Sequence, residues 1–524
     1  MHHTSQSAQF MFRNTLWRYA EKTAVVVDER SYTYKELDDL SSHLAARLHE
    51  QGLEKGDRLA ILFRNCVEYV VADLAILKLG AVKVPLNEML STSDVSYMIE
   101  HSGAKTLVVH SSLSDKLDKP ELSNTELTHI YELDDVGSGI NDAHKNWSGL
   151  FDDKGYDGEL ESFEWVPVAP EDPAFILYTG GTTGRSKGVL HTHGAMMING
   201  LSHVINAEIT ETEKLLLISP LPHAAGFMLQ AGLSHGACIY IQSKFDPDVV
   251  LDTIARQKIT WTFMVPTMIY RVLDAYQPDK HNISSLRTLV YGAAPITRVR
   301  LQEVLDKFGP VLLQLFGQSE VPDFATKLSK ADHLDERFLG SCGQPVLTAD
   351  VRIADEYGEP VAFGEVGEIV VRSPYTLDCY YNDPQKTAEV YVGEWLKTGD
   401  VGYQLESGHV FIVDRSKDMI ISGGMNVYST EVENVVQEHP GVKQVMVIGI
   451  PHEDWGEAVC AAIIPSSEGL DKDDLIAFCK HRLAAYKVPK TIEIVDDIPL
   501  TAYGKPDKKS LRVKYWGDQI RQIN

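Results

Sequence analysis

Strand-like and helix-like segments alternate along most of this chain, and this alternation limits its fold more than any other feature. The stretch "SYTYKELDDLSSHLAARLHEQGLEKGDRLAILF" (31–63) shows one such unit. Thr33 and Glu36 form a capping-box pattern, an apolar helix face follows, and Gly52 precedes the strand-like "RLAILF". Similar units recur at 66–84, 195–206, 247–265 and 298–315. Repeated alternation of this kind predicts an α/β architecture.

The chain has 524 residues, which is too many for one hydrophobic core. Its character changes after "GHVFIVDRSKDMIISGG" (408–424). Beyond residue 427 the patterns predict helices and strands of a compact α+β unit, with helices at 430–438 and 471–485 and strands at 444–450, 458–465 and 491–497. We expect an N-terminal domain over 1–413, a charged hinge at 414–418 and a small mobile domain over 419–524.

Composition disfavours several classes of protein. The net charge of −25, from 49 basic and 74 acidic residues, argues against nucleic acid or an anionic membrane as the main partner. The six cysteines show no paired spacing, so we expect reduced thiols in a cytoplasmic protein rather than a zinc site or disulfides. The longest apolar run (67–86) is broken by Asp73 and Lys78, which predicts a buried helix and no integral membrane segment. Residues 111–163 are polar, acidic and weakly periodic, which predicts a solvated surface excursion.

The segment "ILYTGGTTGRSKGVLHTHG" (176–194) has the composition of an anion-binding loop. Ordering so many glycines costs backbone entropy, and an anion held by N–H groups, hydroxyls and a lysine would offset that cost. The order of residues around Lys187 does not match G-x-x-x-x-G-K-[ST], and no G-x-G-x-x-G opens a helix here. The segment therefore disfavours a P-loop NTPase and a nicotinamide-binding fold.

Six further segments follow in a fixed order along the chain: "SPLPHAAGF" (219–227), "YGAAPI" (291–296), "LFGQSE" (315–320), "WLKTGDVG" (395–402), "VDRSKDMIISGGMNVYSTEVE" (413–433) and "PLTAYGKPDKKSL" (499–511). Together with the Gly/Thr loop, they resemble the motif set of the adenylate-forming superfamily, from about residue 12 to 511. That superfamily includes acyl-CoA synthetases, firefly-luciferase-like enzymes and the adenylation domains of peptide synthetases. The resemblance implies a large multi-subdomain N-terminal domain and a small mobile C-terminal one. It also implies an AMP-forming reaction that uses ATP, Mg²⁺ and coenzyme A.

The resemblance assigns a role to each motif around the nucleotide. The phosphates of ATP would be clamped by Thr179, Gly180, Gly181, Thr182, Thr183, Gly184 and Lys187. The adenine and ribose would be bound by Gly292, Ala293, Ala294, Phe316, Gly317, Ser319, Asp400 and Arg415. Glu320 would hold Mg²⁺, a hard cation that prefers carboxylate oxygen. Two positions depart from the usual pattern, because Gly180 stands where many members carry Ser and Phe316 replaces a frequent Tyr, so two hydroxyl contacts are absent.

Other motif residues are implied in catalysis and in binding the thiol. Lys505 would bridge the attacking carboxylate and the α-phosphate, and His223 would gate the acyl pocket. Lys417 would stand at the hinge, where the small domain swings between the two half-reactions. Coenzyme A would pass along Gly423, Gly424 and Trp455, although Trp455 as a plain core residue is an alternative. Lys508 or Lys509 stands where Arg is common, which leaves the role of that position open.

The gate segment indicates what kind of acid is bound. Amino-acid-adenylating relatives place an Asp there, whereas this chain has His223-Ala224-Ala225, which disfavours an amino acid. Neither Arg nor Lys occurs in "HAAGFM", "YGAA" or "FGQSEV", so a second substrate carboxylate would lack a partner. The residues expected near the acyl group are small or apolar: Ala224, Ala225, Phe227, Met228, Met264, Ala293 and Ala294.

We therefore expect an apolar carboxylic acid, first a medium- or long-chain fatty acid and next an aryl or alicyclic acid. A ligase that loads a phosphopantetheinyl carrier protein fits the same motifs, as does a luciferase-type oxygenase. The expected partners are small molecules, with no nucleic acid, and a homodimer is compatible with the sequence.

Two motif lysines should serve different half-reactions. Losing one preorganised donor to developing charge costs roughly 10²–10³ in rate. Lys505→Ala should therefore slow acyl-AMP formation while leaving thioester formation from supplied acyl-AMP nearly intact. Lys417→Pro fixes φ at about −65° and should block the rotation of the small domain. This variant should therefore form acyl-AMP but not transfer the acyl group to coenzyme A. Separate assays of the two half-reactions test this, and impairment of the same step by both substitutions would refute it.

Overall fold

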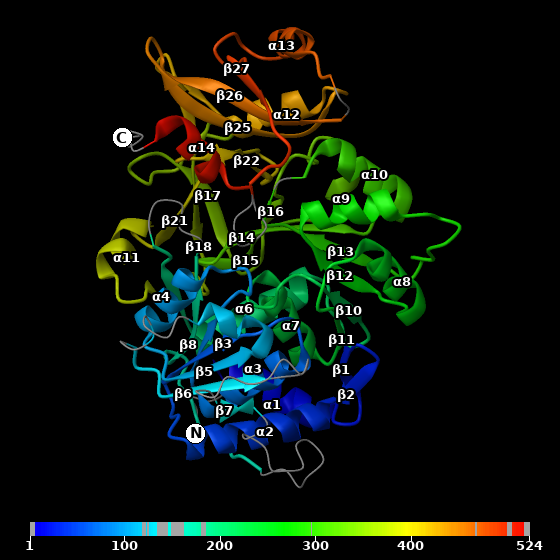
Figure 1. Cartoon of the computed structure of the whole chain (residues 1–524), viewed down its shortest axis with the longest axis vertical. Helices are drawn as coiled ribbons and strands as arrows, with labels where there is room; N and C mark the ends of the chain where they lie inside the picture. Colours follow the sequence, from blue (N-terminus) through cyan, green and yellow to red (C-terminus); the bar gives the residue numbers. More distant parts are fainter. Residues whose placement is uncertain are drawn as a thin grey trace.

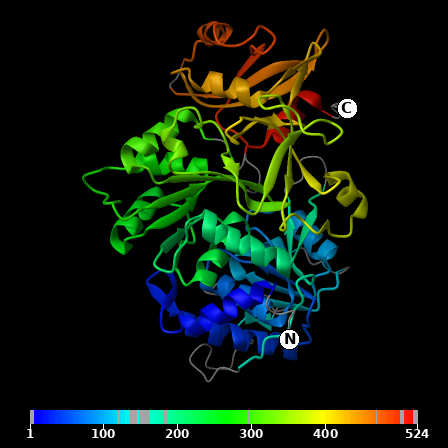
Figure 2. The same cartoon turned by 180° about the vertical axis from the view of Figure 1, so that it is seen from behind.

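The computed structural model describes residues 6–117, 122, 125–133, 145–147, 162–179, 185–294, 296–466, 469–499 and 506–517. A large α/β region carries a small α+β region at one end, and helices α1 (Ala8–Arg18) and α2 (Tyr34–Glu50) lie at the opposite end (Figures 1 and 2). The predicted fold class is therefore confirmed. None of the described helices is both long enough and apolar enough to span a membrane.

The first large sheet has eight strands and provides the Gly/Thr loop. In spatial order they are β19 (Cys379–Tyr380), β9 (Gly188–Thr192), β8 (Pro173–Tyr178), β4 (Val82–Pro85), β3 (Arg58–Leu62), β5 (Thr106–His110), β6 (His129–Leu133) and β7 (Lys145–Asn146). Its strands β4, β3, β5 and β6 are parallel, and helix α4 (Thr92–Ser102) packs on one face. The opposite face packs against α2 and α3 (Val67–Leu79), the buried helix predicted from the broken apolar run.

The second large sheet has nine strands and carries the adenine-side motifs. In spatial order they are β16 (Gln344–Pro345), β15 (Val321–Leu328), β14 (Leu312–Gln318), β13 (Thr288–Tyr291), β12 (Trp261–Met264), β10 (Lys214–Leu217), β11 (Cys238–Ile241), β1 (Thr23–Val27) and β2 (Arg30–Thr33). One face is covered by α8 (Pro247–Gln257), α9 (Pro266–Ala275) and α10 (Arg298–Phe308). The other face joins the main core, where α6 (His193–Asn206) contacts strands of both large sheets beside α7 (Ala224–His235).

A third sheet and the small region complete the chain. The third sheet contains β17 (Asp350–Ala354), β18 (Gly367–Arg372), β21 (Trp395–Gln404), β20 (Tyr391–Val392) and β22 (Val410–Arg415), with α11 (Pro384–Val390) nearby. The small region contains β23 (Ile420–Ser422), β24 (Met425–Val427), β25 (Val442–His452), β26 (Gly456–Pro465) and β27 (Thr491–Ile494), with helices α12 (Ser429–Gln437), α13 (Lys472–Lys480) and α14 (Lys508–Trp516).

Two local predictions were wrong. The helix expected at 471–485 ends at Lys480, and turns follow it. The stretch 111–163 is no simple surface excursion where it is described, because β6 and β7 extend the eight-stranded sheet and Trp147 is 2% exposed. The strand "HIYEL" is too short and too polar for its pattern alone to reveal it, and a parallel neighbour supplies its hydrogen bonds.

Three buried histidines should make the fold sensitive to acid. Burial lowers the pKa of His191, His193 and His333 to about 4. Histidine in the unfolded chain titrates near about 6.5, so between these values the unfolded chain binds protons that the folded chain does not. Stability is thus retained above the unfolded pKa and falls as the pH drops toward 4.

We expect the free energy of unfolding to fall by about 2 kcal/mol per histidine between pH 7 and pH 5. Urea midpoints at pH 7, 6 and 5 measure this loss. His193→Leu should flatten the dependence, because neither ring nitrogen of His193 has a hydrogen-bond partner among the described residues. A wild-type midpoint that stays constant over this range would contradict the prediction.

Candidate functional site

The Gly/Thr loop connects β8 to β9 across an antiparallel pair. Its stem is closed by the pairing of Tyr178 with Gly188, and the Thr179 amide donates to the Lys187 carbonyl at 3.0 Å. The central residues predicted to clamp phosphate, Gly180, Gly181, Thr182, Thr183 and Gly184, lie outside the described residues. The structure therefore places the two ends of the predicted phosphate loop, Thr179 and Lys187.

Tyr380 joins two of the predicted ligand-binding residues. The Lys187 ammonium lies 4.5 Å from the centroid of the Tyr380 ring, and the Tyr380 hydroxyl donates to Glu320 Oε1 at 2.7 Å. Burial and the negative charge of Glu320 raise the pKa of Tyr380, which keeps the phenol protonated as a donor. Sequence reasoning missed this residue, because the nearby turn signal "NDP" (382–384) marks the chain reversal and not the side chain.

Glu320 occupies the tight turn between β14 and β15, and this turn is held from the other large sheet. His191 Nε2, on β9, donates to the Ser319 carbonyl at 2.8 Å. The Leu377 amide donates to the Glu320 carbonyl at 2.7 Å. Because the His191 pKa of about 4 leaves the ring neutral, the carbonyl fixes the tautomer with the proton on Nε2. These contacts position the Glu320 carboxylate.

The two residues predicted for ribose lie together. Asp400 and Arg415 are opposite each other in the β21–β22 pair, with Arg415 Nε 3.3 Å from Asp400 Oδ1. Gln318 Nε2 donates to Asp400 Oδ2 at 2.7 Å and to the Thr398 carbonyl at 2.8 Å. Asp400 is buried, at 5% exposed, so its acceptors are oriented before any ligand arrives. Gln318 was missed, although it lies between the predicted residues 317 and 319.

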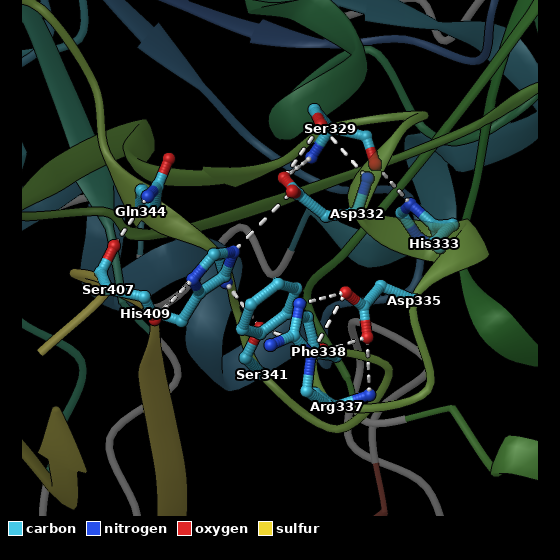
Figure 3. A network of polar contacts seen from close by, with 11 residues as sticks. Ser329, Asp332, His333, Asp335, Arg337, Phe338, Ser341, Gln344, Ser407 and His409 are labelled. Atoms are coloured by element: carbon cyan, nitrogen blue, oxygen red, sulfur yellow. Dashed lines mark hydrogen bonds and ion pairs between the residues drawn. The ribbon is translucent and has the colours of Figure 1, made fainter. Parts of the chain in front are cut away.

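A polar network anchors the far end of the β21–β22 hairpin (Figure 3). The ring of His409 stacks on Phe338, with centroids 3.6 Å apart and planes 4° apart. His409 Nε2 lies 3.6 Å from Asp332 Oδ1, and Gln344 Nε2 donates to the Ser407 carbonyl at 2.6 Å. The hairpin is thereby fixed to the segment that follows β15. This anchoring supports the contact between Gln318 and Asp400 at the hairpin's other end.

The predicted adenine loop follows β13 and is tightly packed. A Cβ on Gly292 would lie 2.7 Å from the Leu315 carbonyl oxygen, so glycine is required there by packing. Ala293 has φ +66°, a left-handed conformation that costs energy in a non-glycine residue and is common at ligand sites. The hydroxyl of Tyr291 contacts His333 Nε2 at 2.9 Å, which ties this strand to the segment after β15. Ala294 is half-buried.

Packing also accounts for two other motif residues. Phe316 is 9% exposed and belongs to the main core. A Cβ on Gly317 would lie 2.6 Å from the Val321 carbonyl oxygen and from the Asp323 nitrogen. Adenine binding by this segment stays a proposal.

His223 stands at the N-cap position of α7 and is half-buried. Four residues further along the helix, the ring of Phe227 packs against Phe175 at 5.6 Å and His203 at 5.8 Å between centroids. Of the other predicted wall residues, Ala225 and Met228 are buried in the main core, Ala224 and Ala294 are half-buried, and Ala293 is exposed. Met264 is buried on the other face of the nine-stranded sheet, so the prediction that it lies beside the gate residues was wrong. Apolar side chains of α7 therefore lie next to the predicted gate.

The proposed hinge, 414–418, begins at the last two residues of β22 and leads toward β23, next to a buried set of charges. Asp414 accepts a hydrogen bond from the Ser429 hydroxyl at 2.8 Å. Lys508 Nζ donates to the same hydroxyl at 2.5 Å and lies 2.9 Å from Glu433. Burial opposes the charge of Lys508, but Glu433 and Asp414 outweigh that effect and raise its pKa. The sequence left open whether Lys508 or Lys509 stands where Arg is common. Of the two, Lys508 forms the buried ion pair, whereas Lys509 is exposed.

Charged residues also flank Lys417. Asp418 pairs with Arg512 of α14 at 2.8 Å, and burial together with the nearby Arg415 charge lowers the pKa of Lys417. Lys505, the predicted catalytic lysine, lies outside the described residues. The hinge at 414–418 and its motion stay predictions.

The residues predicted to line the thiol tunnel form one exposed surface. Gly423 and Gly424 have φ +60° and +78°, and the Gly423 amide donates to the Trp455 carbonyl at 2.9 Å. Trp455 is 38% exposed, which excludes the alternative of a plain core residue. Its ring stacks on His452 at 4.7 Å, and the Lys490 ammonium lies 4.6 Å from its centroid.

The donor set fits a magnesium ion held mainly by a substrate. Glu320 offers one hard carboxylate, and the described residues contain no group of three or more His, Cys, Asp or Glu side chains able to hold a metal. Mg²⁺ is usually bound through one or two carboxylates together with phosphates and water, so a single Glu is sufficient protein ligation. When bound with ATP, Mg²⁺ would neutralise phosphate charge beside Glu320.

Tyr380→Phe tests the junction between Lys187 and Glu320. It removes the donor to Glu320 and keeps the ring beneath Lys187, so we expect the KM for Mg·ATP to rise about tenfold, as for losing a hydrogen bond to a charged group. Tyr380→Leu, which also removes the ring, should raise it further. The KM for the acid should change little. Steady-state kinetics of both variants measure this, and an unchanged nucleotide KM in both would contradict the assignment.

Comparisons with known proteins agree with this geometry. Residues 12–381 match the AMP-binding enzyme family, and residues 431–505 match the AMP-binding enzyme C-terminal domain. A medium/long-chain-fatty-acid–CoA ligase of Mycobacterium tuberculosis is 34% identical, with 97% of this chain and 90% of that protein covered. A feruloyl-CoA synthase of an Amycolatopsis species is 36% identical, with 94% and 96% covered. The amide bond synthetase McbA from Marinactinospora thermotolerans superposes with a TM-score of 0.86 at 31% identity, covering 97% of this chain and 100% of that one. The chain therefore belongs to the AMP-binding enzyme family, within the adenylate-forming superfamily.

Proposed function

We propose that this ATP-dependent acid–CoA ligase activates an apolar monocarboxylic acid, with a medium- or long-chain fatty acid as the first candidate. In the first half-reaction, a carboxylate oxygen attacks the α-phosphorus of ATP, an acyl–phosphate bond forms and pyrophosphate leaves. In the second, the sulfur of coenzyme A attacks the acyl carbonyl carbon, the thiol proton passes to solvent and AMP leaves.

The observation that carries the proposal is the junction at Tyr380. It holds a cation from the phosphate loop, Lys187, beside the carboxylate of Glu320, where both a nucleotide polyphosphate and its metal would be engaged. The pair Asp400 and Arg415 supports a ribose site, because it offers acceptors and a donor to the two hydroxyls. Catalysis then consists of positioning and charge neutralisation, to which Lys505 would contribute the bridging cation.

The gate segment and the relatives support the proposed substrate class. The apolar side chains of Ala225 and Phe227, next to His223 on α7, support a monocarboxylate over an amino acid or a dicarboxylate. One relative is named for fatty acids and another for an aryl acid, so an aryl or alicyclic acid is the second candidate. The exposed Trp455 surface supports a pantetheine-bearing acceptor, either coenzyme A or a carrier protein. A cytoplasmic compartment and a homodimer are further proposals.

The test is product analysis with a panel of acids. With coenzyme A and a suitable acid, the protein should convert ATP to AMP and pyrophosphate, and octanoate or phenylacetate should outcompete malonate and free amino acids in ATP–pyrophosphate exchange. Glu320→Gln should abolish most of the exchange. Release of ADP and phosphate would overturn the reaction type, and a preference for a dicarboxylate or an amino acid would overturn the substrate class.

A further inference from the structure

A buried histidine–carboxylate pair lies behind the gate, outside every motif described above. His203 Nε2, on α6, lies 3.0 Å from Asp323 Oδ2, on β15. The ring of His203 stacks on Phe227 at 5.8 Å and meets Phe324 edge-on at 5.1 Å. Phe227 is four residues beyond His223 on α7, and Asp323 is three residues beyond Glu320. The pair therefore stands on the acyl side of the site, among aromatic rings.

The hydrogen bonds of His203 fix which carboxylate oxygen is occupied. Its Nδ1 lies 2.8 Å from the Asn199 carbonyl, which can only accept, so Nδ1 carries a proton. Its Nε2 then shares one proton with Asp323 Oδ2. The other oxygen, Oδ1, has no partner among the described residues, and 11% of the Asp323 side chain remains exposed while the His203 side chain is fully buried. One acceptor is thus left in an otherwise apolar wall.

The backbone around Asp323 is rigid, so this acceptor is held in one place. Asp323 has φ +62° in a bulge of β15, where the pairing with β14 slips. Asn199 Nδ2 donates to the Pro322 carbonyl at 2.9 Å, and the Tyr375 hydroxyl donates to the Phe324 carbonyl at 2.5 Å. Bulges of this kind re-aim a side chain near active sites.

We propose that Asp323 accepts a hydrogen bond from the far end of the acyl group, so the preferred acid carries a hydroxyl or N–H donor remote from its carboxylate. This inference rests on the proposed function and narrows its substrate class. An acid without the donor would leave a desolvated carboxylate oxygen of Asp323 unpaired. Sites built for hydrogen bonding therefore discriminate against such an acid far more strongly than against one that differs by a single methylene. His203 acts as the positioning residue that orients the carboxylate.

The experiment uses matched acids on the wild-type enzyme first. The pairs are 4-hydroxycinnamate with cinnamate and 8-hydroxyoctanoate with octanoate, and the readout is kcat/KM for AMP release. We expect the hydroxylated acid of at least one pair to be preferred by about tenfold or more. If no acid releases AMP, the proposed function fails. If acids are turned over but neither pair shows this preference, only the present inference fails.

Variants then locate the preference. Asp323→Gly tolerates the left-handed backbone and deletes the acceptor, so the ratio of kcat/KM within the preferred pair should fall about tenfold or more, mainly through the KM of the hydroxylated acid. Asp323→Asn keeps the shape and should lower the same ratio. The matched control is Glu213→Gln. Glu213 is another buried carboxylate, which pairs with Arg287 at 2.6 Å at the opposite end of the sheet's strands. This substitution should leave the ratio unchanged. A ratio that survives both Asp323 substitutions would overturn the assignment.

Discussion

The site depends on a joint between the two large sheets at the Ser319–Glu320 turn. This turn belongs to the nine-stranded sheet, but His191, Leu377 and Tyr380, which hold it, come from the eight-stranded sheet or the segment leading into its edge strand. Each contact uses a neutral donor to a carbonyl or to the carboxylate itself. Because two sheets fix one turn, the carboxylate keeps its direction without an ion pair to any residue that the structure describes, and its charge stays available to a ligand.

Motif glycines show how packing and function share residues. Glycine is required at positions 292 and 317 by backbone contacts within the protein, whatever ligand approaches from the other side. The same tight contacts hold Ala293 and Asp323 in left-handed conformations that a looser structure would relax. Two of the seven described non-glycine residues with positive φ therefore lie in the segments next to the predicted adenine and acyl groups.

Features encoded locally could be predicted from the sequence, whereas features made by distant partners could not. The capping box at Thr33 and the buried helix in the apolar run that Asp73 interrupts follow from spacing over a few residues, and both are present. Tyr380 and Gln318 act through partners 60 and 82 residues away, so no local pattern marks them. The error over 111–163 has the same cause, since β6 obtains its stability from the neighbouring strand β5 rather than from its own periodicity.

The strand pairs that build the site also constrain how the chain reaches its native state. Val25 pairs with Ile239, and Leu190 pairs with Cys379, so both large sheets are completed by contacts between residues far apart along the chain. Closing such long loops is slow, because the entropy of closure must be lost before the pairing is gained. The edge strand that brings Tyr380 beside Glu320 is therefore expected to join late in folding. A nucleotide that binds there would bind only the native state and would shift the folding equilibrium toward that state by mass action.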